Sequence, residues 1–223
     1  NKIKLITIDI EVAAESGFPD VFNVAEELLL ITIQDYATKR IITFGSRPYT
    51  QNPQRKNHIY IDCHSEEGLI TRFVDWWTKN TPEVITGWNC EMYDIPYLMG
   101  RIERLIGEKY AKRMSPWGIC RRNEITIHGR PNIVYDIAGI SVIDYLDLYK
   151  KSPATPNQES FKLDHIAMME LGQKKLDHSE FDTFRDFYTK NWQKFVDYNI
   201  VDVELVDRLE DKLKLIDLCC TRA

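Results

Sequence analysis

Hydrophobic positions in the first half of the chain form short runs and alternations that are typical of β-strands. Segments 4–12, 27–36 and 39–45 carry this pattern and predict a meander of three strands, with the polar residues 35–39 as a hairpin turn. Residues 58–62 predict one more short strand. The first segment has the composition of a buried strand, so we expect it at the centre of a sheet.

Helical periodicity enters after these strands. Ser65 is a predicted N-cap for a helix over 66–80, and residues 83–87 predict another buried strand. Apolar residues then recur with a period of about 3.6 between Ile95 and Ile106, which predicts an amphipathic helix.

The remaining pattern contains one hairpin, one strand and a helical tail. Residues 123–137 alternate on both sides of 128–132, which predicts a long, exposed hairpin. A strand is predicted at 140–146, and the chain after about Ser160 has a helical pattern. Strands interleaved with helices indicate a fold of the α/β or α+β class, with a mixed central sheet flanked by helices.

Length and composition restrict the kind of protein. A chain of 223 residues with 43% hydrophobic residues predicts a single domain over 1–223 with a substantial core. No apolar stretch reaches the roughly 18 residues of a membrane span, and no secretory leader is recognised. The chain begins with Asn and enters its first strand almost at once, so we expect a fragment of a longer polypeptide.

Charge and cysteine content change this picture little. The five cysteines show no C-x-x-C pair, which favours a reduced interior over disulfides or a zinc site. The formal net charge of −5 argues against a broad basic surface for nucleic acid.

The first strand ends in two acids that share one face. Side chains two residues apart in a strand point the same way, about 6.5 Å apart along it, so Asp9 and Glu11 are neighbours. The strand end could simply meet solvent there. Alternatively, the two carboxylates hold a hard cation between them, because adjacent carboxylates repel each other unless one is protonated or a metal intervenes.

A third acid, Asp94, stands at the start of a predicted helix, immediately before Ile95-Pro96. Asp is a favoured N-cap and Pro is tolerated in the first turn, so helix capping explains this residue when it is considered alone.

The fourth acid is the most informative. A helical projection of residues 192–216 places Asp202 in the middle of an apolar stripe, with Tyr198 one turn before it. The other members of the stripe are Phe195, Leu205, Val206, Leu209, Leu213 and Ile216. The opposite, solvent side receives Asp197, Glu204, Asp207, Arg208 and Asp211. A buried carboxylate is costly unless it is paired or bound to metal, and no Lys or Arg lies on the stripe near Asp202, which favours metal.

Three segments that carry these acids resemble the exonuclease motifs of family B DNA polymerases. They are "DIE" at residues 9–11, "NCEMYD" at 89–94 and "YNIVD" at 198–202. Between the last two, "GISVIDYLDLYKK" and "SFKLDHIA" are similar to the corresponding stretch in polymerases of T-even-type bacteriophages, and the similarity extends over nearly the whole chain.

The resemblance implies a ribonuclease H-like exonuclease fold with a protruding β-hairpin, and 3′→5′ proofreading of a primer strand. It implies that Asp9, Glu11, Asp94 and Asp202 bind two divalent cations, Mg²⁺ or Mn²⁺, and that Tyr198 positions the attacking water. Tyr four residues before the last Asp indicates the tyrosine type of these DEDD exonucleases. Two-cation phosphoryl hydrolysis needs such rigidly held acids, which would explain their place on a central strand.

Further residues follow from the same resemblance. Phe18 matches an aromatic that packs on the frayed primer bases, although a loop Phe covering the core is the alternative. Lys175 matches a basic residue near the site, with a solvated Lys, or a shift of the alignment onto Lys174, as alternatives. Asn89 belongs to the second motif and is assigned to DNA binding. The hairpin matches one that parts primer from template, and a plain surface hairpin is the alternative.

The implied partners are the single-stranded or frayed 3′ end of DNA, the polymerase domain of the same polypeptide and, through the full-length enzyme, a sliding clamp and replication proteins in the cytoplasm of the host cell. No membrane partner is expected. Two other functions stay open: a free-standing exoribonuclease of the ribonuclease D kind, and a non-catalytic domain that binds single strands or has a structural role in the polymerase.

Overall fold

A six-stranded mixed sheet forms the centre of the computed structural model, which describes residues 3–15 and 18–221. The strand order is β4-β3-β2-β1-β5-β8. The six strands are β1 (Leu5–Val12), β2 (Leu28–Asp35), β3 (Ile41–Gly45), β4 (His58–Asp62), β5 (Val84–Gly87) and β8 (Ser141–Asp144). β1 pairs antiparallel with β2 and parallel with β5, so the acidic strand lies inside the sheet, as its sequence predicts.

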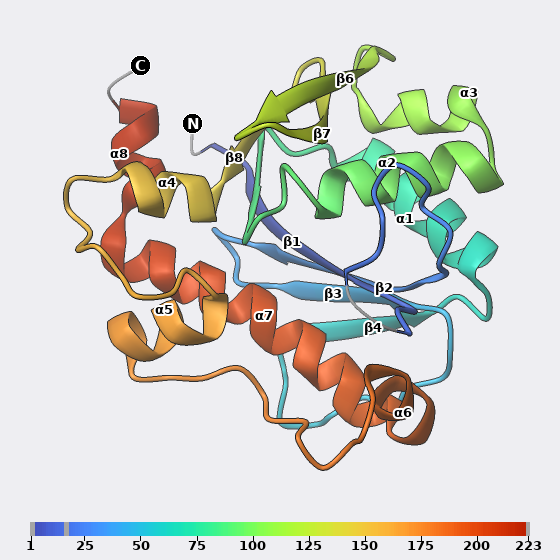
Figure 1. Cartoon of the computed structure of the whole chain (residues 1–223). Coiled ribbons are helices and arrows are strands. Elements are labelled where there is room, and N and C mark those ends of the chain that lie inside the picture. Colours follow the sequence, from blue (N-terminus) through green and yellow to red (C-terminus); the bar gives the residue numbers. More distant parts are fainter. Residues whose placement is uncertain (1–2, 16–17, 222–223) are drawn as a thin grey trace.

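Helices cover both faces of this sheet and its ends (Figure 1). They are α1 (Glu66–Asn80), α2 (Asp94–Leu105), α3 (Glu108–Ala111), the short 3₁₀ helix η1 (Lys112–Met114), α4 (Tyr145–Lys151), α5 (Leu163–Leu171), α6 (Phe184–Lys190), α7 (Trp192–Leu213) and α8 (Leu215–Thr221). The predicted N-cap is confirmed, because the Ser65 hydroxyl accepts a hydrogen bond from the Gly68 N–H at 3.0 Å. None of the helices in the described segments has the length and hydropathy needed to cross a membrane.

The core is divided between the two faces of the sheet. One large cluster joins alternate residues of β1, beginning with Ile6 and Ile8, to the inner faces of α1 and α2. On the other face α7 lies across β1, β2 and β3, as Figure 1 shows. Its N-terminal half packs with α6 and its C-terminal half with α5. The domain is therefore a sandwich of helix, sheet and helix, with both faces of β1 buried.

A separate two-stranded hairpin, β6 (Cys120–Ile127) and β7 (Arg130–Ile137), lies against α2. Its inner face consists of Ile133, Tyr135 and Ile137 in β7, while most of β6 is exposed. The predicted turn over 128–132 is too long. Only His128 and Gly129 form it, both with positive φ (47° and 74°), as a tight two-residue hairpin turn requires.

The meander predicted for the first three strands is confirmed, and β4 extends the sheet by pairing parallel with β3. Two other predicted boundaries are wrong for identifiable reasons. The strand predicted over 140–146 ends at Asp144, whose carboxylate accepts a hydrogen bond from the Leu146 N–H at 3.0 Å and so begins α4. Residues 173–183, predicted as helix, are irregular between α5 and α6.

Candidate active site

The two acids of β1 face α7, as the alternation of the strand predicts. Ile6, Ile8 and Ile10 belong to the cluster under α1 and α2, which leaves the opposite face for Asp9 and Glu11. The Asn199 side-chain amide of α7 donates a hydrogen bond of 2.7 Å to Asp9 Oδ2. The acids therefore do not leave the core for solvent; they end in a cleft of about 940 Å³.

Asp202 of α7 completes a cluster with these acids. One carboxylate oxygen each from Asp9, Glu11 and Asp202 lies within 4.8 Å of the others. Asp202 is 4% exposed, and its Oδ1 has no hydrogen-bond partner among the described residues. An unpaired buried carboxylate oxygen next to two more acids fits a hard cation, because Mg²⁺ and Mn²⁺ prefer oxygen ligands.

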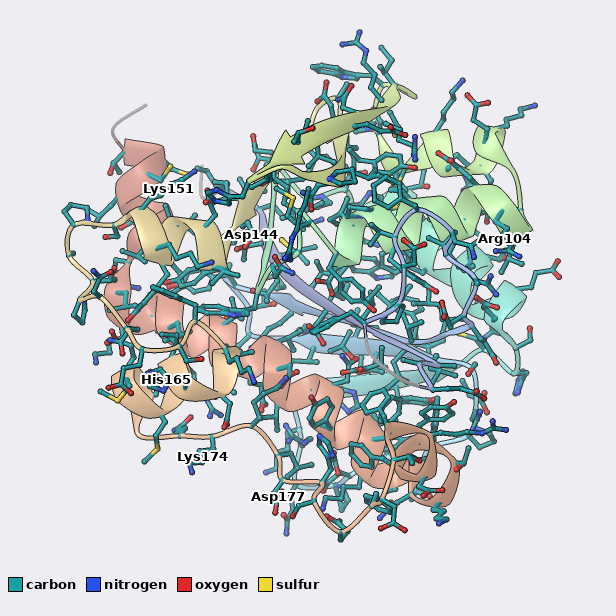
Figure 2. All side chains as sticks on the ribbon, in the orientation of Figure 1. Arg104, Asp144, Lys151, His165, Lys174 and Asp177 are labelled. Atoms are coloured by element: carbon teal, nitrogen blue, oxygen red, sulfur yellow. The ribbon has the colours of Figure 1, made fainter. Side chains whose placement is uncertain are left out.

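The prediction that Asp202 has no cationic partner is wrong. Lys175 Nζ lies 2.5 Å from Asp202 Oδ2 and 4.8 Å from the centre of the Tyr198 ring. A helical projection misses this contact because Lys175 belongs to the irregular segment before α6, and only the tertiary fold brings it to α7. Lys175 is not a solvated side chain, and its neighbour Lys174 is exposed on the outer surface (Figure 2).

Asp94 enters the cleft from the other side of β1. It is 2% exposed and is the first residue of α2, but its side chain caps no helix N–H. Instead, Asp94 Oδ1 accepts a hydrogen bond of 3.0 Å from the main-chain N–H of Ile10 in β1. The capping interpretation is therefore wrong. Asp94 is instead fixed to the main chain of Ile10, the residue between Asp9 and Glu11 in β1.

Burial and mutual repulsion set the protonation of these acids. Burial raises the pKa of Asp9 well above its ordinary value, and three neighbouring carboxylates raise it further. Burial also raises the pKa of Asp94 to about 7, although the Ile10 N–H opposes this effect. Burial raises the pKa of Asp202 while the charge of Lys175 lowers it. The cluster thus favours protons, or another source of positive charge, over four free carboxylates.

Three more residues surround the acids. Tyr198 lines the cleft, and burial together with Glu11 and Asp202 raises the pKa of its phenol, so it is a neutral hydroxyl at pH 7. Phe18 also lines the cleft and is 90% exposed, 6.2 Å from the Tyr93 ring edge-on, so it does not cover the core. Asn89 also lines the cleft and has a positive φ of 66°.

Asn199 is a site residue that the sequence analysis did not identify. It is fully buried, three residues before Asp202 on the same side of α7, and it holds Asp9 by its amide. Its spacing from Asp202 was a usable signal, since residues three apart on a helix are neighbours.

Comparison with known proteins agrees with this geometry. Residues 1–166 match the family described as DNA polymerase family B, exonuclease domain. The chain is 32% identical to the DNA-directed DNA polymerase of Escherichia phage RB69 over 241 residues, which covers 97% of this chain and 26% of that protein. It is 35% identical to the DNA-directed DNA polymerase of Enterobacteria phage T4 over 160 residues, or 72% of this chain and 18% of that protein.

A more distant relative is also a DNA polymerase. The DNA polymerase of Bombyx mori nuclear polyhedrosis virus is 28% identical over 156 residues, 69% of this chain and 16% of that protein. The chain spans about a quarter or less of the length of these three relatives. With a family match over well over half of its residues, and with the fold and acidic cleft described above, the chain belongs to the exonuclease domains of family B DNA polymerases.

Proposed function

We propose that this domain hydrolyses the 3′-terminal phosphodiester of single-stranded or frayed DNA, releases nucleoside 5′-monophosphates, and proofreads for a phage DNA polymerase. The observation that carries the proposal is the meeting of Asp9, Glu11 and Asp202 within 4.8 Å in an open cleft. Asp94 and Tyr198 line the same cleft. Membership of the family supports the reaction class, and the acids support its chemistry.

The residues present fit two divalent cations. Asp9, Glu11, Asp94 and Asp202 would hold them through carboxylate oxygens, with the unpaired Oδ1 of Asp202 among the ligands. When bound, Mg²⁺ or Mn²⁺ lowers the pKa of a water and neutralises the charge that builds on the scissile phosphate.

The chain's own residues then orient the reaction. The neutral hydroxyl of Tyr198 would hydrogen-bond the attacking water and hold it in line with the phosphorus–oxygen bond that breaks. Water adds to phosphorus, the 3′-oxygen of the preceding nucleotide leaves and takes up a proton, and the released nucleotide keeps the 5′-phosphate. Lys175, charged because its acidic neighbours raise its pKa, would contact the phosphate.

The exposed ring of Phe18 would stack on the terminal bases, which is tolerant of sequence as proofreading requires. The substrate end would have to be single-stranded to reach acids that line the cleft and are mostly buried. We also propose that the domain works beside the polymerase domain of the same polypeptide and, through the full-length enzyme, with a sliding clamp.

Degradation of 5′-labelled oligonucleotides in Mg²⁺ tests the proposal. We expect single-stranded DNA to be shortened fastest, a mismatched primer end next and a matched end slowest, because opening a matched step costs about 1–2 kcal/mol. EDTA should abolish the reaction. Products with a 3′-phosphate, equal rates on matched and single-stranded ends, or preference for an RNA oligomer would each contradict it.

A further inference from the structure

The carboxylate of Asp144 organises the connection that leads into α2. This side chain is 7% exposed at the end of β8 and lies inside the fold beside α4, as Figure 2 shows. Besides capping α4, Oδ1 accepts a hydrogen bond of 3.1 Å from the Asn89 N–H, and Oδ2 accepts one of 3.0 Å from the Glu91 N–H. Asp144 therefore binds two main-chain groups of a segment more than fifty residues earlier in the chain.

A carboxylate suits this position because every partner is a main-chain donor. Asp144 accepts three N–H groups with its two oxygens, whereas an amide side chain would direct its own N–H groups at one of them. A serine hydroxyl can still cap a helix, but it is too short to accept all three bonds. Capping and bridging are thus separable by substitution.

The bridged connection has a conformation that it would not adopt readily by itself. Asn89 has φ of 66°, in the left-handed region. Gly87, two residues before Asn89, lies so close to β1 that a Cβ there would be 2.5 Å from the carbonyl oxygen of Ile8. The turn continues with hydrogen bonds from Tyr93 N–H to Asn89 O and from Ile95 N–H to Cys90 O, and it delivers Asp94 directly onto the N–H of Ile10.

We propose that Asp144 is a positioning residue for the proposed hydrolysis: its two bonds to the connection before α2 hold Asp94 and Asn89 in place on the cleft. The inference rests on the proposed function only where it concerns turnover. Its structural part, the fixed place of Asp94 beside the acids of β1, concerns metal binding and main-chain order and is measurable without substrate.

The experiment compares Asp144→Ser with Tyr145→Phe, using the whole chain. Serine keeps a favoured cap for α4 and loses the bridge. Tyr145→Phe removes the 3.1 Å hydrogen bond to Glu210 at the same helix start and leaves the bridge intact. Both variants perturb α4, so a general loss of stability would affect them alike. Asp144→Asn, which also keeps the cap but opposes the Glu91 N–H with an amide, is the second test variant should serine prevent folding.

Three measurements follow: hydrogen exchange of amides 89–95 in EDTA, Mn²⁺ affinity by electron paramagnetic resonance, and hydrolysis of single-stranded DNA at saturating metal. For Asp144→Ser we expect faster exchange at Asn89 and Glu91, Mn²⁺ affinity lower by about 10- to 100-fold, the range typical of supports of metal ligands, and a lower kcat with a smaller change in KM. Tyr145→Phe should match wild type in all three.

Wild-type exchange and Mn²⁺ affinity in Asp144→Ser would overturn the inference, and so would equal losses in Tyr145→Phe. If the wild-type domain binds Mn²⁺ in an Asp144-dependent way but does not shorten DNA, the proposed function fails while the positioning role stands.

Discussion

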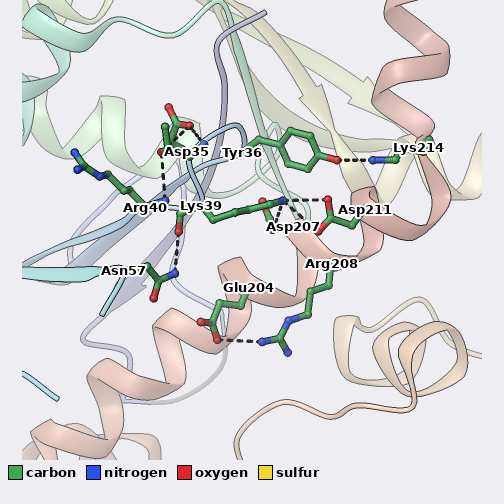
Figure 3. Close-up of polar contacts among 11 residues, drawn as sticks. Asp35, Tyr36, Lys39, Arg40, Asn57, Glu204, Asp207, Arg208, Asp211 and Lys214 are labelled. Atoms are coloured by element: carbon green, nitrogen blue, oxygen red, sulfur yellow. Dashed lines mark hydrogen bonds and ion pairs between the residues drawn. The ribbon is translucent and has the colours of Figure 1, made fainter. Parts of the chain in front are cut away.

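Helix α7 carries buried acids in two regions, and the charge of these acids is balanced differently in each region. Near its middle, Asp202 lies with Asp9 and Glu11, and Lys175 is the cation that contacts it. One and a half turns later, Asp207 forms an ion pair with Lys39 at 2.7 Å. The same Lys39 forms a second ion pair with Asp211 at 3.0 Å, as Figure 3 shows.

The next acid, Glu210, is satisfied by neutral donors. It accepts hydrogen bonds from the Tyr145 hydroxyl and from the Ile216 and Asp217 N–H groups of α8. The C-terminal region of α7 therefore gives each buried acid a partner from the chain, whereas the cleft gathers more carboxylates than it has cations to pair with them. This difference distinguishes an acid that holds the fold together from an acid kept available for a ligand.

Matched neutral substitutions in the two regions should give the largest contrast. Asp9→Asn should reduce hydrolysis of single-stranded DNA by about 10³-fold or more, equivalent to about 4 kcal/mol, because the proposed site loses one of its metal ligands. In EDTA its free energy of unfolding should equal or exceed that of wild type, since burial and three acids already oppose the Asp9 charge. Asp207→Asn should leave the rate unchanged. An Asp9→Asn domain with half the wild-type rate would contradict the proposed site.

The ion pair at the cleft can be tested against its exposed neighbour. Lys175→Met should lower the free energy of unfolding by roughly 3 kcal/mol in EDTA at pH 8, because a buried carboxylate loses its partner. Mn²⁺ should narrow this gap by supplying positive charge. Lys174→Met is the matched control and should melt like wild type. Equal free energies of unfolding for both variants in urea titrations would show that the burial of Asp202 does not depend on its ion pair with Lys175.

The pH dependence of stability should change sign with metal. The pKa of Asp94 is about 7 in the folded chain against 3.8 when unperturbed, so the folded state holds its proton longer. Without metal, the contribution of protonated Asp94 to the free energy of unfolding is complete below pH 4. It is lost as pH rises toward 7, and the free energy of unfolding falls by up to about 1.4 kcal/mol per pH unit. In saturating Mg²⁺ stability should instead rise with pH, because the cation needs deprotonated ligands.

Asp94→Asn provides the control for that slope. The charged groups facing Asp94 are Asp9, Glu11, Asp202 and Asp144, and they remain in the variant. Urea unfolding in EDTA between pH 5 and 8 should show a shallower fall for Asp94→Asn than for wild type. Identical slopes would mean that Asp94 titrates normally in the folded protein.

The smallest effect is expected at the C-terminal region of α7. Lys39→Met breaks the ion pairs with Asp207 and Asp211, but Lys39 is 39% exposed and solvent screens it, so the cost should be about 1 kcal/mol or less. Burial already raises the pKa of Asp207 to about 6 despite Lys39, so protonation partly relieves the loss near that pH. Thermal unfolding would measure it, and a drop in hydrolysis would contradict the separation of the two regions.

The local sequence pattern was sufficient to predict most helices and strands and the face on which the acidic side chains lie. The alternation of β1 predicts which face carries Asp9 and Glu11, and the Ser65 cap predicts the start of α1. Asp202 follows from the helical period of α7, and it is buried as expected. These features depend on neighbours within one or two turns, which a sequence displays directly.

Contacts between distant segments were not accessible in this way. Asp207 was predicted on the solvent side of α7 but is 3% exposed, because the β2–β3 turn brings Lys39 over it. Lys175 and Asp144 act through partners many residues away, and neither a hydrophobic period nor a capping rule contains that information. Asp94 was explained as a cap for the same reason, since its real partner is the main chain of β1.

The separation of the acids along the chain has a consequence for synthesis. Asp9 stands in the first strand, and its partner Asn199 is 190 residues later, on the last long helix. A chain made from its N-terminus therefore has β1, β5 and the hairpin on the outside of the ribosome before any complete acid cluster exists. The proposed nuclease activity can therefore begin only after α7 has been made and has docked across the sheet.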